Sequence, residues 1–94
     1  ALPVHRPAAA LRADVVRAHR SPGRLAGLTD RELEVLQGLV EGWSAREIAD
    51  RLGVAVNTVR THVQRILRKL GARGHLEAVR IARSEGVFPR NQGL

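Results

Sequence analysis

Two helix-start signals of the same kind lie close together in this sequence, and they constrain its fold more than any other feature. The stretches "LTDREL" and "SARE" each place a hydroxyl residue, Thr29 and Ser44, three positions before a glutamate. This spacing is that of a capping box, in which side chain and backbone close the first turn of a helix reciprocally. Gly42 and Gly53 follow the two stretches and can end each helix in the left-handed conformation. The pattern predicts one helix that ends at Gly42 and a second, of about two turns, that ends at Gly53.

A longer helix is predicted after Gly53, where "VAVNTVRTHVQRILRKL", residues 54–70, carries two stripes. At roughly 100° per residue, one side of this helix is aliphatic and is expected in the core. It consists of Val59, Val63, Ile66, Leu67 and Leu70. The opposite side is polar and cationic, and it consists of Asn57, Arg60, Thr61, Gln64 and Arg68. A short helix, a glycine turn and a longer helix are the parts of a helix-turn-helix.

The apolar pattern elsewhere predicts a single small core of aliphatic side chains. Of the 94 residues, 44% are hydrophobic and only 2% aromatic, so Leu, Val, Ile and Ala must supply that core. Gly71 and Gly74 interrupt the chain before a last predicted helix over residues 75–86. We therefore expect an all-α, compact four-helix domain over residues 28–88. The predicted inward-facing residues of the first two helices are Leu33, Leu36, Leu39, Val40, Ile48, Ala49 and Leu52.

The two ends of the chain differ from this domain in composition. Residues 1–27 hold three of the four prolines and are expected to form a linker, within which residues 7–20 are a candidate for a short extra helix. Residues 89–94 are expected to form a flexible tail. The chain does not begin with methionine, which favours a fragment of a longer protein.

The charge distribution indicates a polyanionic partner. The net charge is +7, and no acidic residue lies between Asp50 and Glu77, where five arginines and one lysine are found. Cysteine is absent, which excludes disulfides and thiolate metal sites. The histidines show no metal-ligand spacing and no nucleophile arrangement is evident, so we expect no cofactor, no metal and no enzyme. Because no apolar run is long enough to span a membrane and no secretory signal is present, we expect a soluble protein without a membrane partner.

The region from "LTDREL" to "GHLEAV" resembles a known family. In "LTDRELEVLQGLVEGWSAREIADRLGVAVNTVRTHVQRILRKLGARGHLEAV", the motifs "LT.RE.EVL", "EIA..LG" and "TV..H...I..KLG" occur in order. Their spacing is similar to that of the LuxR-type helix-turn-helix DNA-binding domain, which is also the C-terminal domain of NarL/FixJ-type response regulators. The resemblance covers about residues 28–83. It implies a bacterial transcription regulator whose third helix enters the DNA major groove and whose fourth helix supports dimerisation. Ala55 departs from the family, which commonly has Ser or Thr at this position.

The polar side of the 54–70 helix supplies the candidate DNA contacts. Arginine pairs bidentately with guanine, and Asn and Gln pair in the same way with adenine. The resemblance places base-reading positions on Arg60, Thr61 and Gln64, and we add Asn57 near the start of the helix. The candidate phosphate contacts are Ser44, Thr58, His62, Arg65, Arg68 and Lys69.

Several of these residues have an alternative structural role that involves no DNA contact. Ser44 can act as a helix cap alone, and His62, which matches the family's histidine, can serve in packing. The three cations near the C-terminus of the helix can simply favour its dipole. Trp43 is expected to pack over the corner between the first two helices, with base stacking as the alternative.

The last helix cannot bury all of its apolar residues on one face. Leu76, Arg80 and Ile81 are therefore predicted to contact a second copy of the chain. The alternative is that Leu76 packs under the preceding loop and that Ile81 packs against Val87 or Phe88.

These observations predict sequence-specific binding of double-stranded DNA, as a dimer on an inverted repeat. The protein would be a cytoplasmic bacterial regulator that lies on the nucleoid when bound, with RNA polymerase as a further candidate partner. The rival interpretation is a protein-interaction module that docks an acidic partner through the 54–70 helix. Asn57, Thr61 and Gln64 favour base reading, because a protein dock would need apolar anchors on that side.

Overall fold

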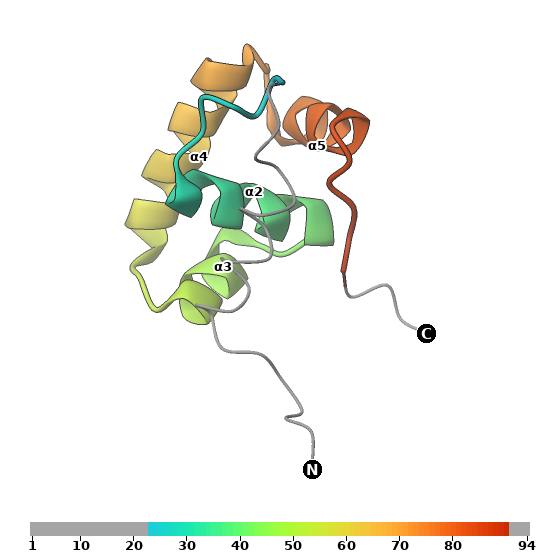
Figure 1. The fold of residues 1–94 in the computed structure, drawn as a ribbon. Helices are drawn as coiled ribbons and strands as arrows, with labels where there is room; N and C mark the ends of the chain where they lie inside the picture. Colours follow the sequence, from blue (N-terminus) through green and yellow to red (C-terminus); the bar gives the residue numbers. More distant parts are fainter. Residues whose placement is uncertain (1–22, 91–94) are drawn as a thin grey trace.

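Four helices form the part of the chain that the computed structural model describes, residues 23–90, and no strand is present in that range (Figure 1). They are α2 (Asp30–Glu41), α3 (Ala45–Leu52), α4 (Val56–Leu70) and α5 (His75–Ser84). The predicted all-α fold, with a short helix, a turn and a longer helix, is confirmed. The candidate helix over residues 7–20 lies outside the described residues.

Local signals set the ends of α2 and α3 as the sequence predicts. The Thr29 hydroxyl accepts a hydrogen bond from the Glu32 N–H at 3.1 Å, and the Glu32 carboxylate accepts one from the Thr29 N–H at 2.9 Å. The capping box that Ser44 opens has the same two distances. Gly42 and Gly53 have φ angles of 85° and 71°, a left-handed conformation that glycine adopts without a Cβ clash. These short-range features define α3 and the turn that leads into α4.

The start of α4 lacks such a cap. Ala55 stands at the N-cap with an extended backbone, and its side chain makes no hydrogen bond to the helix. The missing cap costs on the order of 1 kcal/mol of helix stability. α4 therefore depends on the packing of its aliphatic side against the rest of the fold.

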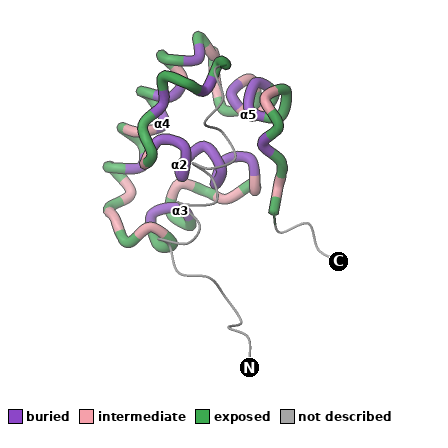
Figure 2. Tube along the Cα trace, viewed as in Figure 1, coloured by how far each residue is buried: buried purple, intermediate pink, exposed green. Residues whose placement is uncertain are grey.

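α2 lies at the centre of the fold, packed against α4 on one side and α5 on another (Figure 1). Its residues 32–40 are all buried, as the continuous purple of α2 in Figure 2 shows. The predicted core residues of α2 and α3 are confirmed, with Leu36 and Ile48 each 1% exposed and Leu52 packed at the edge of the core. Burial of Glu34 and Gln37 was not predicted, because the sequence indicated only one apolar side for this helix.

Gly38 stands at a close approach between α2 and α3. A Cβ at this position would lie 2.7 Å from Cγ1 of Ile48 and 3.2 Å from Cε3 of Trp43. Because Ile48 is in the core, it has little room to move away. The absence of a side chain at Gly38 thus sets the spacing at which α3, and with it the turn into α4, is held.

Both ends of the described region pack against the helices, and packed residues lie on either side of the predicted bounds, 28 and 88. Leu25 is 3% exposed and belongs to the core, so the packed region begins before residue 28. Val87, which lies inside the predicted bounds, is also 3% exposed. The Arg90 N–H donates to Oε2 of Glu41 at 2.6 Å, so residue 90 belongs to the domain as well. Of the predicted tail, residues 91–94 lie outside the described residues.

Candidate nucleic-acid interface

The two stripes predicted for α4 are present on opposite sides of the helix. Val59 and Ile66 are 0% exposed, and the other aliphatic residues of this side lie in the core or at its edge. All five residues of the polar side are exposed to solvent: Asn57, Arg60, Thr61, Gln64 and Arg68. α4 runs along one edge of the molecule (Figure 1). The five exposed side chains extend from its first turn to its last. Within residues 23–90, these side chains are therefore accessible to a partner.

Side-chain geometry on the polar side is partly preset. The Thr61 hydroxyl donates to the backbone carbonyl of Asn57, one turn earlier, at 3.1 Å. This bond holds the side chain in one rotamer and leaves the oxygen lone pairs and the methyl group for a partner.

A shallow apolar hollow of about 310 Å³ lies along one flank of α4. Val63 and Leu67 form its α4 side, and Ala45 of α3 and His75 of α5 contribute to its lining. Arg60 and Gln64 also line this hollow, so both polar side chains emerge beside apolar surface. Long side chains that rest on such a surface lose less freedom when they bind than fully solvated ones.

The start of α3 is already occupied by its own cap. The Ser44 hydroxyl accepts from the Glu47 N–H, and the Glu47 carboxylate accepts from the Ser44 N–H. The hydrogen bonds from the Ser44 backbone and side chain lower the pKa of Glu47 below its usual value, with a smaller contribution from the charge of Arg51. The capping role of Ser44 is therefore seen directly, and a negative charge stands beside the predicted phosphate position.

The remaining phosphate candidates on α4 fall into two groups. Thr58, Arg65 and Arg68 are exposed beside the base-reading candidates. His62 is half-buried, and its Nδ1 atom is buried without a hydrogen-bond partner among the described residues. Packing is thus at least part of the role of His62.

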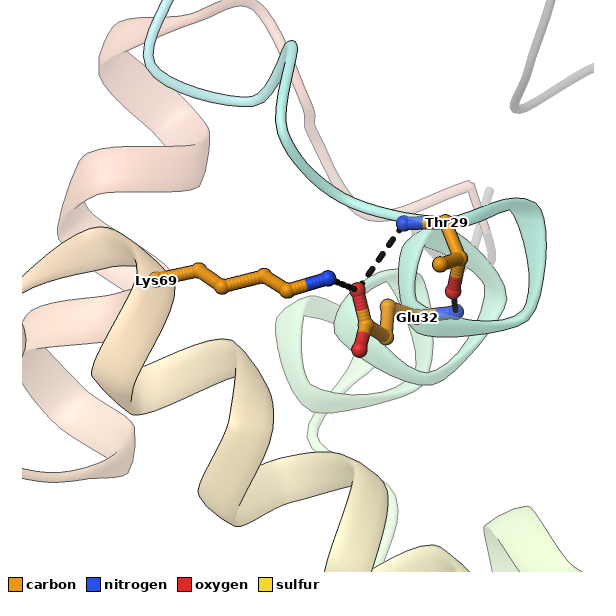
Figure 3. A network of polar contacts seen from close by, with 3 residues as sticks. All are labelled: Thr29, Glu32 and Lys69. Carbon is orange, nitrogen blue, oxygen red and sulfur yellow. Dashed lines mark hydrogen bonds and ion pairs between the residues drawn. The ribbon is translucent and has the colours of Figure 1, made fainter.

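Lys69 is engaged with another helix. Its Nζ lies 2.7 Å from Oε1 of Glu32, which also accepts the hydrogen bond from the Thr29 N–H (Figure 3). The Glu32 side chain is 3% exposed and that of Lys69 is 38% exposed. Burial raises the pKa of Glu32, but the hydrogen bonds from Lys69 and Thr29 and the charge of Lys69 outweigh it, so the pKa lies below its usual value. The sequence did not reveal this pair, because its partners lie on different helices.

We expect this pair to shape the acid stability of the domain. Since the pKa of Glu32 is lower in the folded than in the unfolded state, its contribution is present at neutral pH. It is lost as the pH falls below about 4.5. Glu32→Gln keeps an acceptor for the capping box and removes the charge, so it should lower the unfolding free energy at neutral pH by about 1–3 kcal/mol. Its stability should also fall less steeply with acid than that of the wild type, as measured by urea unfolding at a series of pH values.

Asp50→Asn, which removes an exposed carboxylate on α3, is the matched control and should leave the acid dependence unchanged. The same pH dependence for Glu32→Gln and wild type would show that the ion pair does not stabilise the domain.

The predicted dimer residues on α5 are separated by the structure. Leu76 is 66% exposed, and Arg80, one turn later, is also exposed. Ile81 is 7% exposed and belongs to the same core cluster as Val87, which contradicts its predicted dimer contact and agrees with the alternative that it packs within its own chain. The physical reason is that α5 packs against both α2 and α4, which covers the side that carries Ile81.

Trp43 packs at the corner between α2 and α3, as predicted. It is half-buried against the core, and the guanidinium carbon of Arg51 lies 3.9 Å from the centroid of its ring. A cation at this distance makes a favourable contact with the ring face. That face is thus covered by the chain's own arginine.

Within residues 23–90, no group of three or more His, Cys, Asp or Glu side chains is placed to hold a metal ion. None of the helices in that range has the length and apolar character needed to cross a membrane.

Comparison with protein families identifies a match over most of this domain. Residues 26–82 match the family model described as bacterial regulatory proteins, luxR family. The match begins before the first capping box, includes α2, α3 and α4, and ends within α5. No solved structure matches the chain significantly.

Several curated proteins are similar to the chain over the same region. The transcriptional regulatory protein DesR of Bacillus subtilis is 39% identical over 61 residues, which are 65% of this chain and 31% of DesR. The DNA-binding transcriptional activator DevR/DosR of Mycobacterium tuberculosis is 42% identical over 74 residues, which are 79% of this chain and 34% of that protein. The nitrate/nitrite response regulator protein NarP of Escherichia coli is 43% identical over 51 residues, or 54% of this chain and 24% of NarP. The chain thus spans about a third or less of the length of these relatives.

Proposed function

Because the chain belongs to the luxR family of bacterial regulatory proteins, we propose that it binds duplex DNA sequence-specifically, with α4 in the major groove, as part of a transcription regulator. The observation that carries this proposal is the exposed polar side of α4, which is backed along the whole helix by a buried aliphatic side. A recognition helix needs this combination, since one side must anchor it while the other meets base edges.

Base reading is assigned to Asn57, Arg60, Thr61 and Gln64. Arg60 has the donors for a bidentate pair with guanine, and Gln64 and Asn57 have a donor and an acceptor suited to adenine. Arg60 and Gln64 lie one turn apart, which separates them by about 6 Å along the helix axis. This separation corresponds to about two base-pair steps of duplex DNA. Neighbouring bases of one half-site are therefore within reach of both side chains.

Backbone contacts are assigned to the exposed residues at the borders of this surface. Arg65 and Arg68 supply positive charge, and Thr58 supplies a hydroxyl donor. Ser44 and His62 are weaker members of this group, because the Ser44 hydroxyl caps α3 and His62 is partly packed.

The regulator is proposed to occupy an inverted repeat as a dimer, with α5 of each copy meeting the other. Leu76 and Arg80 are the exposed residues of α5 that we assign to this contact. RNA polymerase is a further proposed partner, and the proposed location is the bacterial cytoplasm, on the nucleoid when bound.

Docking of an acidic protein through α4 is the rival function. Protein interfaces depend on a few large buried anchors, with aromatic side chains prominent among them. The exposed large hydrophobic residues of the described region are Leu76 and Phe88, and neither lies on α4. The polar side of α4 therefore favours nucleic acid over protein.

Selection of bound duplexes from a random pool tests the proposal. Arg60→Ala and Gln64→Ala should each relax base preference at defined positions, by about 1–3 kcal/mol of discrimination, because a base-edge contact is lost. Arg68→Ala is the matched control, since it should weaken all sequences about equally. Superimposable selection profiles for Arg60→Ala and wild type would show that α4 does not read bases through this residue.

A further inference from the structure

We infer that Lys69 is a positioning residue, which holds the C-terminal half of α4 against the first turn of α2, and that it does not contact DNA phosphate. The inference rests on the proposed function, because what Lys69 positions is the DNA-binding side of α4. The cationic stretch around Lys69 makes it a candidate for a phosphate contact. The structure instead places its side chain on another helix.

The contact of Lys69 with Glu32 is directional and short. The Nζ–Oε1 distance is 2.7 Å, which is within the range of a strong charge-assisted hydrogen bond. Figure 3 shows the lysine side chain extended from α4 towards α2, with its nitrogen next to the carboxylate. A lysine in this position is directed at its own domain.

Glu32 is a fixed anchor for this contact. Its Oε1 accepts a second hydrogen bond from the Thr29 N–H at 2.9 Å, and its own N–H donates to the Thr29 hydroxyl at 3.1 Å. The carboxylate is thus held by the first turn of α2, and its side chain is 3% exposed. For Lys69 to reach a phosphate, this buried carboxylate would have to lose its only ion-pair partner among the described residues.

A second contact from outside α4 holds the same end of the helix. Nη2 of Arg24 donates to the backbone carbonyl of Leu70 at 3.1 Å, and Leu70 itself is 5% exposed in the core. The C-terminal turn of α4 is therefore attached through its side chains and its backbone. The N-terminal end, by contrast, has no side-chain cap at Ala55. The C-terminal end of α4 thus has polar contacts to the rest of the domain that its N-terminal end lacks, where the buried side chain of Val59 anchors the helix in the core.

Arg68 provides the contrast within the same turn. It is exposed and makes no ion pair with a carboxylate among the described residues, and it belongs to the polar side of α4. Two adjacent cations of one helix are therefore assigned different roles, with Arg68 on the DNA and Lys69 on α2.

The test uses Lys69→Met, Glu32→Gln and the double variant that combines these two substitutions. Arg68→Met is the comparison variant, and all are measured on duplexes that carry a single selected half-site. Each variant is measured for unfolding in urea without DNA, for the salt dependence of binding, and for the ratio of affinities for selected and scrambled duplexes. Folding is verified by circular dichroism before binding is measured. Lys69→Arg, which keeps the charge, is the conservative variant.

We expect Lys69→Met to leave the slope of log affinity against log salt unchanged, whereas Arg68→Met should reduce it by about 0.9. Lys69→Met and Glu32→Gln should each lower the affinity for the selected duplex about tenfold and reduce the specificity ratio, with no further loss in the double variant. Lys69→Arg should restore part of that loss. The effect of Glu32→Gln is decisive, because Glu32 is buried and removal of a negative charge would otherwise strengthen DNA binding.

Two results would overturn the inference. A loss of about 0.9 in slope for Lys69→Met would mean that Lys69 contacts phosphate. A loss of stability in Lys69→Met and Glu32→Gln with unchanged affinity and specificity would mean that the pair only stabilises the fold. Failure of the wild type to bind any duplex would instead contradict the proposed function. The unfolding free energies of the two single variants and the double variant would still show whether Lys69 and Glu32 connect α4 to α2.

Discussion

The affinity of this chain for a duplex with its selected inverted repeat should fall about a hundredfold when monovalent salt is raised from about 50 to about 200 mM. Arg65 and Arg68 are the exposed α4 cations assigned to phosphates, so a dimer would neutralise about four phosphates. Each neutralised phosphate releases condensed counterions and contributes about −0.9 to the slope of log affinity against log salt. Because Lys69 is paired with Glu32, we expect it to add nothing to this slope. Binding titrations at several salt concentrations measure this slope of log affinity against log salt.

Arg68→Ala should make the slope for the full site shallower by about 1.8, since both subunits lose one contact. Arg83→Ala removes the same charge from the last turn of α5, where no phosphate contact is assigned, and serves as the control. An affinity that does not change with salt would exclude an electrostatic contribution from α4.

Loss of the α5 contact should have an effect of similar size, but only where two copies bind together. We expect Leu76→Asp to lower the affinity for the full inverted repeat by at least about a hundredfold. Leu76 is 66% exposed in the single chain, and burial of a leucine side chain stabilises by about 1.5–3 kcal/mol. In a two-fold symmetric interface the loss occurs twice, and each 1.4 kcal/mol is about a tenfold change.

The same variant on a half-site duplex is the control, and its affinity should equal that of the wild type. Without DNA, sedimentation should show mainly monomer, because one exposed leucine and Arg80 offer far less area than a stable dimer buries. Equal affinity per half-site in both duplexes, with no loss for Leu76→Asp, would exclude α5 as the dimer contact. Ile81→Asp is not a useful probe, because Ile81 is in the core and its substitution would unfold the domain.

The helices and the candidate DNA-binding side could be predicted because the signals that define them act over short distances along the chain. A capping box joins residues three positions apart, as Thr29 and Glu32 do, and the left-handed turn at Gly53 depends on that residue alone. The two sides of α4 follow from helical periodicity, so the burial of Val59 and the exposure of Arg60 were both accessible from the sequence.

The burial and the contacts of residues that depend on which helices pack together were decided only by the tertiary structure. Periodicity shows that a helix has an apolar side, but not how many neighbours surround it. The burial of Glu34 in α2 was therefore not predicted, and the sequence left two positions open for Ile81 in α5, the surface and the core. Leu25, by contrast, was placed in a linker because its segment has no helical periodicity, and it becomes a core residue only by packing on the helices. Lys69 shows the difference most clearly. Its place in the sequence is that of one more cation. Only the meeting of α4 with α2 brings its ammonium group to a buried carboxylate 37 residues away in the chain, and the attraction of that carboxylate directs the partly exposed lysine inward.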